Sequence, residues 1–282
     1  MRIVLTRHPG QAGDLEAAVQ TAGFDVGFLP LTQQLLPADM TELTEAVELL
    51  THGTFDWLLL TSANTVRALI SCGWDGRAPE QTRVAAVGPG TARVLKDLTT
   101  AGEPWIPEDH SAAGILAELP APTAGRRLLL PQSAQARPQL AEGLRALGWD
   151  LTHVAAYQTV PTSSAAPQPP HRVLLPATEG AVTGKRLDPT DLRDDDVVLL
   201  TSSTAAEAYA QLQPPKAPAL LAIGDPTAAT MDGLGLPVAA VLSEPTAVGL
   251  TSALNEQGFS PEPPSLDWGP DARTPHRPHG GD

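Results

Sequence analysis

The chain has 282 residues, enough for one large domain or two ordinary ones, and its 18 basic and 32 acidic residues give a net charge of −14. This charge argues against broad binding to nucleic acids or anionic membranes, because both are polyanionic. Cys72 is the only cysteine, so an intramolecular disulfide and a multi-cysteine metal site are excluded.

The opening residues, MRIVLTRHPG, lack the charged start and long apolar run of a secretory signal. No stretch approaches the ~18 consecutive apolar residues of a membrane-spanning helix. We therefore expect a cytoplasmic protein with no membrane segment. The histidines form no helical i, i+4 pair, so we expect no metal site.

Met1 to Arg7 is predicted to form a buried strand, and Asp14 to cap a helix that Gly23 closes. Phe24 to Leu29 is predicted to be a second strand. The following LTQQLL, between Pro30 and Pro37, is expected to be an extended linker.

Asp39 to His52 has apolar residues at helical spacing, and Asp39 and Glu42 are placed as a capping box. The next stretch, DWLLLTSANTVRAL from Asp56, returns as DVVLLTSSTAAEAY from Asp196, with six of fourteen positions identical. Each copy has an apolar run, a Thr-Ser pair and helical spacing, which predicts a buried strand, a turn and a helix.

Three further segments recur along the chain. VAAVGPGTA from Val84 matches LLAIGDPTA from Leu220, and SAAGILAEL from Ser111 matches TAVGLTSAL from Thr246, each opened by a hydroxyl residue. The beginning of the chain matches the region from Arg127. The sequence therefore predicts a duplication, residues 2 to 119 and 127 to 254, with strands alternating with helices in a doubly wound parallel sheet. The repeats alone leave tandem and interleaved halves open.

Three regions fall outside this pattern. TSSAAPQPP from Thr162 is predicted to be a linker, and residues 171 to 195 contain one possible strand, Val173 to Leu175. The last 25 residues, from Gly258, contain six prolines and little apolar periodicity, so we expect them to be disordered.

In an open α/β sheet, ligands bind at the carboxyl ends of the strands, where backbone N–H groups and hydroxyls can hold anions. The candidate loops are Thr6 to His8, Thr61 to Asn64, Gly88 to Thr91, Pro131 to Ser133, Thr201 to Thr204 and Gly224 to Thr227. Each motif also has a structural interpretation. Thr-Ser after a strand is most often a turn and helix cap, and GPGT lacks the lysine of a phosphate-binding loop.

Tyr157, in HVAAYQTVP, is one of two tyrosines and lies at the end of an apolar strand. It is either a packed residue at an interdomain joint or a phenol that acts as a weak acid. The residues leave both alternatives open.

Taken together, seven stretches in order resemble the uroporphyrinogen-III synthase family over about residues 2 to 255. They are VLTR near the start, DWLLLTSANTVRAL, VAAVGPGTA, LLLPQSAQARPQLAEGLRALGWDLTHVAAYQT, DVVLLTSS, AIGDPTA and EPTAVGL. The resemblance implies two similar α/β domains joined by two extended linkers. It assigns 1–32 plus 162–257 to one domain and 41–155 to the other, with 33–40 and 156–161 as linkers and 258–282 as a tail.

The implied activity is that of a cyclising hydro-lyase of heme biosynthesis, which converts hydroxymethylbilane into uroporphyrinogen III with loss of water and inversion of the terminal pyrrole. The resemblance makes Tyr157 catalytic and implies no cofactor. It also implies a monomer whose substrate is handed over by the preceding pathway enzyme. The substrate-binding residues, by position in the family or in the candidate loops, are Arg7, Thr61, Ser62, Asn64, Gly88, Thr91, Ser133, Thr201, Ser202, Ser203, Gly224 and Thr227.

A second hypothesis is a cytoplasmic two-lobed binding protein or sensor for a small anionic metabolite, because the fold alone does not choose between the two. Formation of the type III isomer from hydroxymethylbilane distinguishes them.

Overall fold

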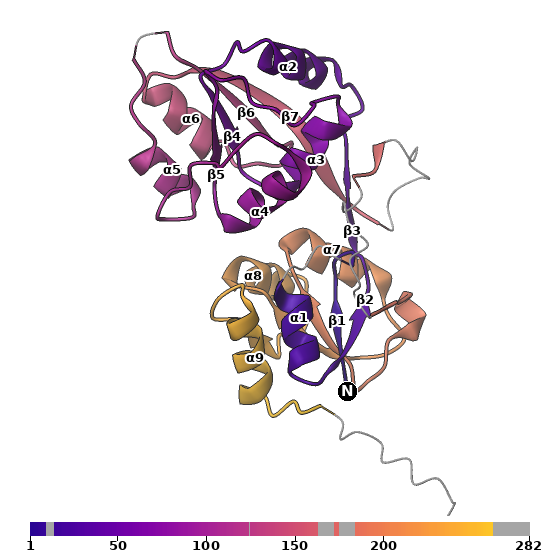
Figure 1. Cartoon of the computed structure of the whole chain (residues 1–282). Coiled ribbons are helices and arrows are strands. Elements are labelled where there is room, and N and C mark those ends of the chain that lie inside the picture. The colour runs from indigo at the N-terminus through magenta and orange to yellow at the C-terminus, as the bar shows by residue number, and fades with distance from the viewer. Residues whose placement is uncertain (10–13, 124, 163–171, 175–183, 262–282) are drawn as a thin grey trace, which may run out of the picture.

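The structure, a computed structural model, describes residues 1–9, 14–123, 125–162, 172–174 and 184–261. Its strands form a six-stranded and a five-stranded sheet, which lie in two lobes stacked end to end (Figure 1). The first lobe contains both ends of the described chain, and the second is made from its middle. Nearly all strand pairs are parallel and helices cover the sheets, so the predicted α/β fold class is confirmed.

The sheet of the first lobe has the order β11-β10-β9-β1-β2-β8, and its pairs are parallel. Its strands are β1 (Arg2–Leu5), β2 (Asp25–Phe28), β8 (Lys185–Arg186), β9 (Val197–Leu200), β10 (Ala219–Ala222) and β11 (Ala240–Val241). Alternate residues of β1 point to opposite faces, as a strand requires. Ile3 and Leu5 pack with α1 (Asp14–Thr21) and α9 (Ala247–Glu256), and Val4 packs with α7 (Ser203–Leu212) and α8 (Asp225–Gly233). A short 3-10 helix, η2 (Pro189–Asp191), follows β8.

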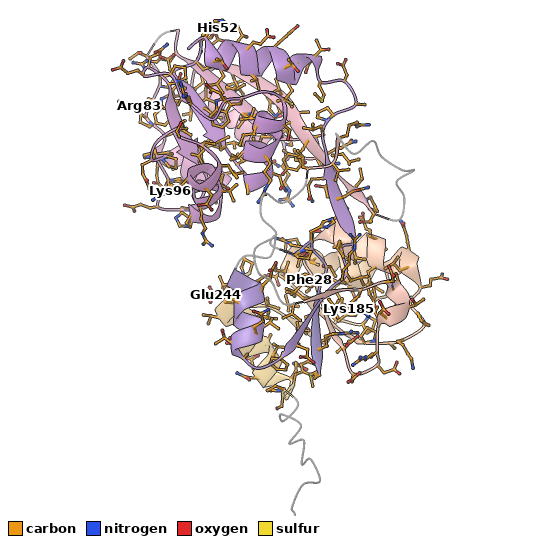
Figure 2. All side chains as sticks on the ribbon, turned by 45° about the vertical axis from the view of Figure 1, so that its right-hand side comes forward. Phe28, His52, Arg83, Lys96, Lys185 and Glu244 are labelled. Atoms are coloured by element: carbon orange, nitrogen blue, oxygen red, sulfur yellow. The ribbon has the colours of Figure 1, made fainter. Side chains whose placement is uncertain are left out.

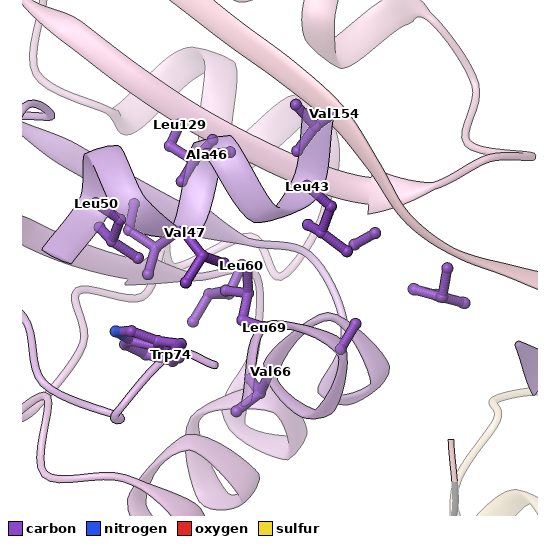
Figure 3. Close-up of a cluster of buried hydrophobic side chains, with 14 of the residues drawn as sticks. Leu43, Ala46, Val47, Leu50, Leu60, Val66, Leu69, Trp74, Leu129 and Val154 are labelled. Atoms are coloured by element: carbon purple, nitrogen blue, oxygen red, sulfur yellow. The ribbon is translucent and has the colours of Figure 1, made fainter. Parts of the chain in front are cut away.

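The sheet of the second lobe has the order β3-β7-β6-β4-β5. Its strands are β3 (Thr32–Leu35), β4 (Trp57–Leu60), β5 (Arg83–Ala86), β6 (Arg127–Ser133) and β7 (Asp150–Pro161). The helices α2 (Thr41–Thr51), α3 (Ala63–Ser71) and α4 (Pro89–Leu98) cover one face, and α5 (Ala112–Glu118) and α6 (Gln139–Ala146) cover the other. Leu50, Leu60 and Leu69 are fully buried in the first of these cores (Figure 3), each contributing about 2 kcal/mol by area.

Helix caps repeat between the lobes. Ser111 Oγ accepts from Gly114 N–H at 3.1 Å at the start of α5, and Thr246 Oγ1 accepts from Gly249 N–H at 3.2 Å at the start of α9. A side chain at either glycine would collide with a loop carbonyl, that of Asp109 or Glu244. Both hydroxyl caps were predicted from the sequence, but the tight approach that requires glycine was not.

The predicted capping box of α2 is wrong. The helix begins at Thr41 after Met40, which has no capping side chain. Asp39 Oδ1 instead accepts from the Thr41 N–H at 3.0 Å and from the Thr41 hydroxyl at 2.7 Å. The aspartate therefore binds the first turn from one residue further out, and Glu42 does not reach back to it.

The two lobes are connected through β3 and β7, which pair antiparallel from Thr32↔Pro161 to Leu35↔Gln158. A third segment, Arg172 to Leu174, lies on the other side of β3. Leu36 N–H donates to Arg172 O at 2.7 Å, and Leu174 N–H donates to Gln34 O at 2.9 Å. The strand predicted over Val173 to Leu175 is thus present as a bridge between Val173 and Leu35, with Leu175 outside the described residues.

The C-terminal segment begins differently from the expectation. Phe259 N–H donates to Leu254 O at 2.9 Å, and the Phe259 ring packs against the core of the first lobe. Pro261 lies next to Gly23. The expected disorder therefore does not begin at Gly258, and residues 262–282 lie outside the described chain.

Candidate functional site

The carboxyl ends of the strands in the two lobes face each other. The chain passes from β2 into β3 and so enters the second lobe, while β7 runs antiparallel to β3 and parallel to β6. His52 and Arg83, just before β4 and at the start of β5, lie at the end of the second lobe remote from the first (Figure 2). The strand-to-helix loops that the sequence nominated therefore come from facing ends of two sheets.

Three hydroxyl groups meet at the second-lobe turn, Thr61 to Asn64. Ser62 caps α3 and accepts from the Thr65 N–H at 3.2 Å. Its Oγ also lies 3.1 Å from Thr65 Oγ1 and 3.0 Å from the Tyr157 hydroxyl. Ser62 and Tyr157, both predicted site residues, are brought together although 95 positions separate them.

A β-bulge directs Tyr157 toward this turn. In the β6–β7 pair, Gln132 pairs with Ala155 but Ser133 pairs with Tyr157, so β7 has one extra residue, Ala156. Strict alternation would place Ala156 and Tyr157 on opposite faces. The bulge instead puts both in the core beside α3, since bulges re-aim side chains. Tyr157 is therefore only 8% exposed as a residue.

Hydrogen-bond capacity favours one direction for these contacts. A serine hydroxyl has one proton and two acceptor sites, and Thr65 N–H occupies one acceptor site of Ser62. Thr65 is fully buried, and Ser62 is the one acceptor near its hydroxyl among the described residues. If Thr65 donates to Ser62, both acceptor sites are filled, and Ser62 must donate to Tyr157. The phenol proton is then left to point away from Ser62.

The first turns of α4 and α8 are near copies. Gly88 and Gly224 cap the two helices in extended conformation, and an added Cβ would meet nothing closer than 3.5 Å at Gly88 and 4.0 Å at Gly224. Neither conformation nor packing requires glycine there, so the bare backbone leaves room for a ligand. Thr91 and Thr227, three residues on in each turn, are buried, and neither hydroxyl has a partner within the described chain.

The first-lobe turn, Thr201 to Ser203, is more strongly bonded internally. Thr201 is buried, and its N–H and hydroxyl lie 3.3 Å from Thr6 Oγ1, which itself donates to Leu199 O. Ser202 caps α7 by accepting from the Ala205 N–H at 3.1 Å. Ser203 donates to Pro226 O at 3.2 Å and accepts from Thr230 at 2.8 Å, so it joins α7 to α8.

Cationic side chains lie at the carboxyl end of β1. Arg7 donates to Thr201 O at 3.4 Å, and burial lowers the pKa of its guanidinium, which stays protonated. Burial and then the nearby charge of Arg186 lower the pKa of His8. The positive charge here is therefore that of Arg7 and Arg186, in a protein that is strongly acidic as a whole.

The remaining predicted residues have separate surroundings. Thr61 is half-buried, and its hydroxyl has no partner in the described parts of the chain. Asn64 Oδ1 accepts from Arg67 Nη1 at 3.0 Å. Ser133 donates to Gln135 Oε1 at 2.8 Å, and Gln135 is bonded to the backbone of Thr159. The Ser133 hydroxyl thus stabilises its own loop beside Tyr157.

Sequence reasoning missed two residues here. Thr65 is three positions after the capping serine, where a side chain can reach back to the cap, and that spacing would have identified it. Arg67 lies three positions after Asn64 on the same helical face. Thr6, which supports the first-lobe turn, belongs to a nominated loop but was not singled out.

Two negative results concern the described residues only. They contain no group of three or more His, Cys, Asp or Glu side chains that is able to hold a metal ion. None of their helices has the length and apolar character needed to cross a membrane.

Comparison with known proteins points to one family. Residues 13–252 match the family described as uroporphyrinogen-III synthase HemD. The uroporphyrinogen-III synthase of Synechococcus elongatus is 30% identical over 161 residues, covering 56% of this chain and 60% of that protein. The chloroplastic uroporphyrinogen-III synthase of Oryza sativa subsp. japonica is 26% identical over 186 residues, covering 64% of this chain and 59% of that protein. The chain thus spans about three fifths of the length of these relatives.

Solved structures resemble the fold. The uroporphyrinogen-III synthetase of Helicobacter pylori 26695 matches with a TM-score of 0.51 at 16% identity, over 91% of this chain and 100% of that one. A mutant uroporphyrinogen III synthase of the extremely thermophilic bacterium Thermus thermophilus matches with a TM-score of 0.50 at 19% identity, over 91% of this chain and 99% of that one. Because the family match extends over most of the sequence, the chain belongs to the uroporphyrinogen-III synthase family.

Proposed function

We propose that this protein is a uroporphyrinogen-III synthase, which cyclises hydroxymethylbilane with inversion of the terminal pyrrole and loss of water. Family membership supports the reaction, as do the names of the relatives. The observation that carries the proposal within this chain is the contact of Tyr157 with Ser62, at 3.0 Å, at the carboxyl end of the second sheet.

In the proposed first step, the Tyr157 O–H gives its proton to the hydroxyl of the substrate. The C–O bond breaks, water leaves, and the adjacent pyrrole nitrogen supplies the electron pair that forms the azafulvene cation. Ser62, donating to the phenol oxygen, stabilises the developing phenolate, and Thr65 stabilises Ser62 in turn. Because the electron pair of the pyrrole nitrogen helps to expel the water, Tyr157 has to contribute only modest general acid catalysis.

The next steps need positioning more than acid. The substituted carbon of the terminal pyrrole attacks to form a spiro intermediate, one carbon–carbon bond breaks, and the inverted ring recloses. The proton that the pyrrole carbon loses at the end returns to the Tyr157 phenolate. No net proton is consumed, and the released water is the only by-product. Holding the folded substrate therefore selects the isomer.

Carboxylates are proposed to bind at the helix starts. The first turns of α3, α4 and α7 contain no acidic residue, and free N–H groups at helix N-termini favour anions. Thr91 and Thr227 add hydroxyls without protein partners in the described chain, one from each lobe. The two turns differ in charge, because the first turn of α8, unlike that of α4, contains an acid, Asp225. Gly88 and Gly224 give the substrate access to the backbone.

We propose that the lobes act as domains 1–32 plus 162–257 and 41–155, with 33–40 and 156–161 between them. Within the first of these ranges, Arg172 to Leu174 crosses to pair with β3, and Leu174 packs in the second-lobe core. We propose further that the protein acts as a cytoplasmic monomer that receives its substrate from the preceding pathway enzyme. These points rest on the resemblance to the family. No observation favours the alternative of a binding protein or sensor, so that alternative is left as an outcome of the test.

The test is to incubate the protein with freshly made hydroxymethylbilane, oxidise the product and separate the isomers by chromatography. Type III isomer formed well above the uncatalysed rate supports the proposal. Only type I isomer, at the rate of the buffer control, contradicts it and leaves the binding-protein hypothesis.

Tyr157→Phe then tests the mechanism, with Tyr209→Phe as the matched control because Tyr209 is a buried tyrosine in the other lobe. We expect Tyr157→Phe to lower the saturated rate of type III formation by about 10²-fold, the low end for general acid catalysis. Tyr209→Phe should leave it unchanged. Equal rates for both variants, with folding confirmed by circular dichroism, would make Tyr157 a packing residue.

A further inference from the structure

Arg67 has a buried donor without a partner. Its Nη1–H donates to Asn64 Oδ1 at 3.0 Å, but its Nε–H is buried and has no hydrogen-bond partner among the described residues. The residue as a whole is half-buried. A buried N–H that makes no hydrogen bond costs free energy, so this position is not optimised for stability in the absence of a ligand.

No carboxylate in the described chain pairs with Arg67. Arg2, Arg77, Arg126 and Arg127 all lie within 4 Å of an aspartate. Arg67 has only a neutral amide oxygen, in a chain with 32 acidic residues. Burial lowers the pKa of its guanidinium, yet arginine stays protonated, so a partly buried charge is left without a counter-charge.

The guanidinium lies at the candidate site. Helical side chains lean toward the N-terminus, and the bond to Asn64 places the head of Arg67 over the first turn of α3. Asn64 is two positions from Ser62, which contacts Tyr157. The unpaired charge is therefore within one helical turn of the hydroxyl chain formed by Thr65, Ser62 and Tyr157.

We infer that Arg67 binds a side-chain carboxylate of the substrate through its Nε and one Nη, and that Asn64 holds it in the resting state. The inference rests on the proposed function and adds to it a residue that selects for anionic substituents. A carboxylate offers two acceptor oxygens where Asn64 offers one. We therefore expect the Arg67 side chain to rotate away from Asn64 toward the substrate carboxylate, as interface side chains commonly change rotamer on binding. The orphaned Nε–H is then satisfied.

Arg67→Gln tests this, with Arg145→Gln as the control, because Arg145 is an exposed arginine on α6 in the same lobe. Two readouts are used: the KM and kcat for hydroxymethylbilane, and the Kd of the oxidised product, uroporphyrin III, from quenching of tryptophan fluorescence. We expect Arg67→Gln to raise KM and Kd about tenfold, the size of one hydrogen bond to a charged group, with a smaller change in kcat. Arg145→Gln should match the wild type.

Asn64→Asp separates this role from a structural one, since it keeps Arg67 but places a carboxylate beside its guanidinium. We expect the internal ion pair to compete with the substrate and to weaken binding as much as Arg67→Gln, while the melting temperature holds or rises. The double variant Asn64→Arg with Arg67→Gln should recover part of the affinity.

Wild-type affinity for uroporphyrin III in a folded Arg67→Gln variant would overturn the inference while leaving the proposed function intact. Tight binding in Asn64→Asp would overturn it equally. If the wild type forms no type III isomer and binds no uroporphyrin III, the proposed function fails and this assignment of Arg67 fails with it.

Discussion

The two Thr-Ser turns have nearly the same local structure and different surroundings. Ser62 and Ser202 each cap a helix by accepting the N–H three residues on, at 3.2 and 3.1 Å. In the second lobe that third residue is Thr65, whose hydroxyl continues to Ser62 and Tyr157. In the first lobe it is Ala205, so no hydroxyl chain forms.

The two lobes therefore share the same helix cap but differ in what the cap supports. In the first lobe, Ser203 and Thr230 join two helices, and Thr6 and Thr201 bind each other across the sheet. These contacts pair the hydroxyl groups within the protein and are expected to make the first-lobe turn rigid. In the second lobe, the bulge in β7 brings a phenol to the same kind of turn. The chemistry is therefore expected to be concentrated on one side.

A second pair of equivalent contacts lies at the opposite ends of the sheets. Each Thr-Ser strand is preceded by an aspartate, Asp56 or Asp196. Asp196 has a fully buried side chain and accepts from Arg2 Nε at 3.0 Å, Arg2 Nη2 at 2.6 Å and Arg193 N–H at 2.8 Å. Asp56 is 29% exposed and accepts from Arg126 and from the Arg127 N–H.

The largest expected effect comes from breaking the buried pair. Asp196→Asn leaves Arg2 without its counter-charge, and we expect a loss of about 3–5 kcal/mol in the free energy of unfolding, as for other buried ion pairs. Asp56→Asn, the matched change in the second lobe, should cost about 1 kcal/mol because solvent screens it. Urea unfolding measures both, and equal losses would show that the two contacts are equivalent in energy despite their burial.

The next effect concerns the hydroxyl chain. Thr65→Val keeps the shape of the side chain and removes its hydroxyl, so Ser62 has a free acceptor site and Tyr157 turns its proton inward. We expect kcat to fall about tenfold with KM nearly unchanged, below the loss from removing the acid itself.

Thr65→Ser is the control for this change, since it restores the hydroxyl with less packing volume. It should recover most of the turnover even though it is less stable than the valine variant. If turnover instead follows stability across the three proteins, Thr65 contributes through packing alone.

A smaller effect should distinguish the lobes by stability. We compare chains ending after Pro261 and after Gly258, which differ in Phe259 and the two residues after it. Phe259 is half-buried against the first-lobe core, and its loss should cost about 1 kcal/mol by area. The first-lobe transition in thermal unfolding should shift down, and the second-lobe transition should not. A shift of both transitions together would show that the lobes unfold as one unit.

The smallest effect is confined to high pH. Burial raises the pKa of Tyr209, in the first lobe, to about 12. The folded state then holds its proton more tightly than the unfolded chain, so the stabilisation is fully present below pH ~10 and is lost as the pH rises toward 12. Tyr209→Phe should match the wild type at pH 7 and lose less stability above pH 10. The same alkaline loss in both proteins would assign it to other groups.

Most of the fold was predictable because it depends on local patterns. The apolar runs ending in Thr-Ser predicted β4 and β9 with their helices, and the hydroxyl caps at Ser111 and Thr246 followed from residue type. The repeats did not decide which halves pair. That depends on contacts between β1 and β9, such as Ile3↔Val197, which join residues about two thirds of the chain apart.

The site was predictable as a set of loops but not as a geometry. The bulge that turns Tyr157 depends on how β7 pairs with β6, and the residue types around Ala156 do not predict a bulge. Thr65 and Arg67 were overlooked because each resembles an ordinary helical residue until its partner is known. The third segment beside β3, Arg172 to Leu174, similarly depends on a distant pairing.

The interleaved connectivity has a consequence for synthesis on the ribosome. The strands of the second lobe are consecutive in the chain and can pair as they emerge, whereas β1 needs β9 and β2 needs β8 as its second neighbour. About 170 residues separate Phe28 from Val197, so at ~5–20 residues per second the wait is roughly 8 to 34 s. Throughout that interval the strand that contains Ile3, Val4 and Leu5 lacks its partner β9. The nascent chain is therefore expected to expose its hydrophobic N-terminal strand even after the second lobe has folded. Molecular chaperones are expected to bind this exposed strand.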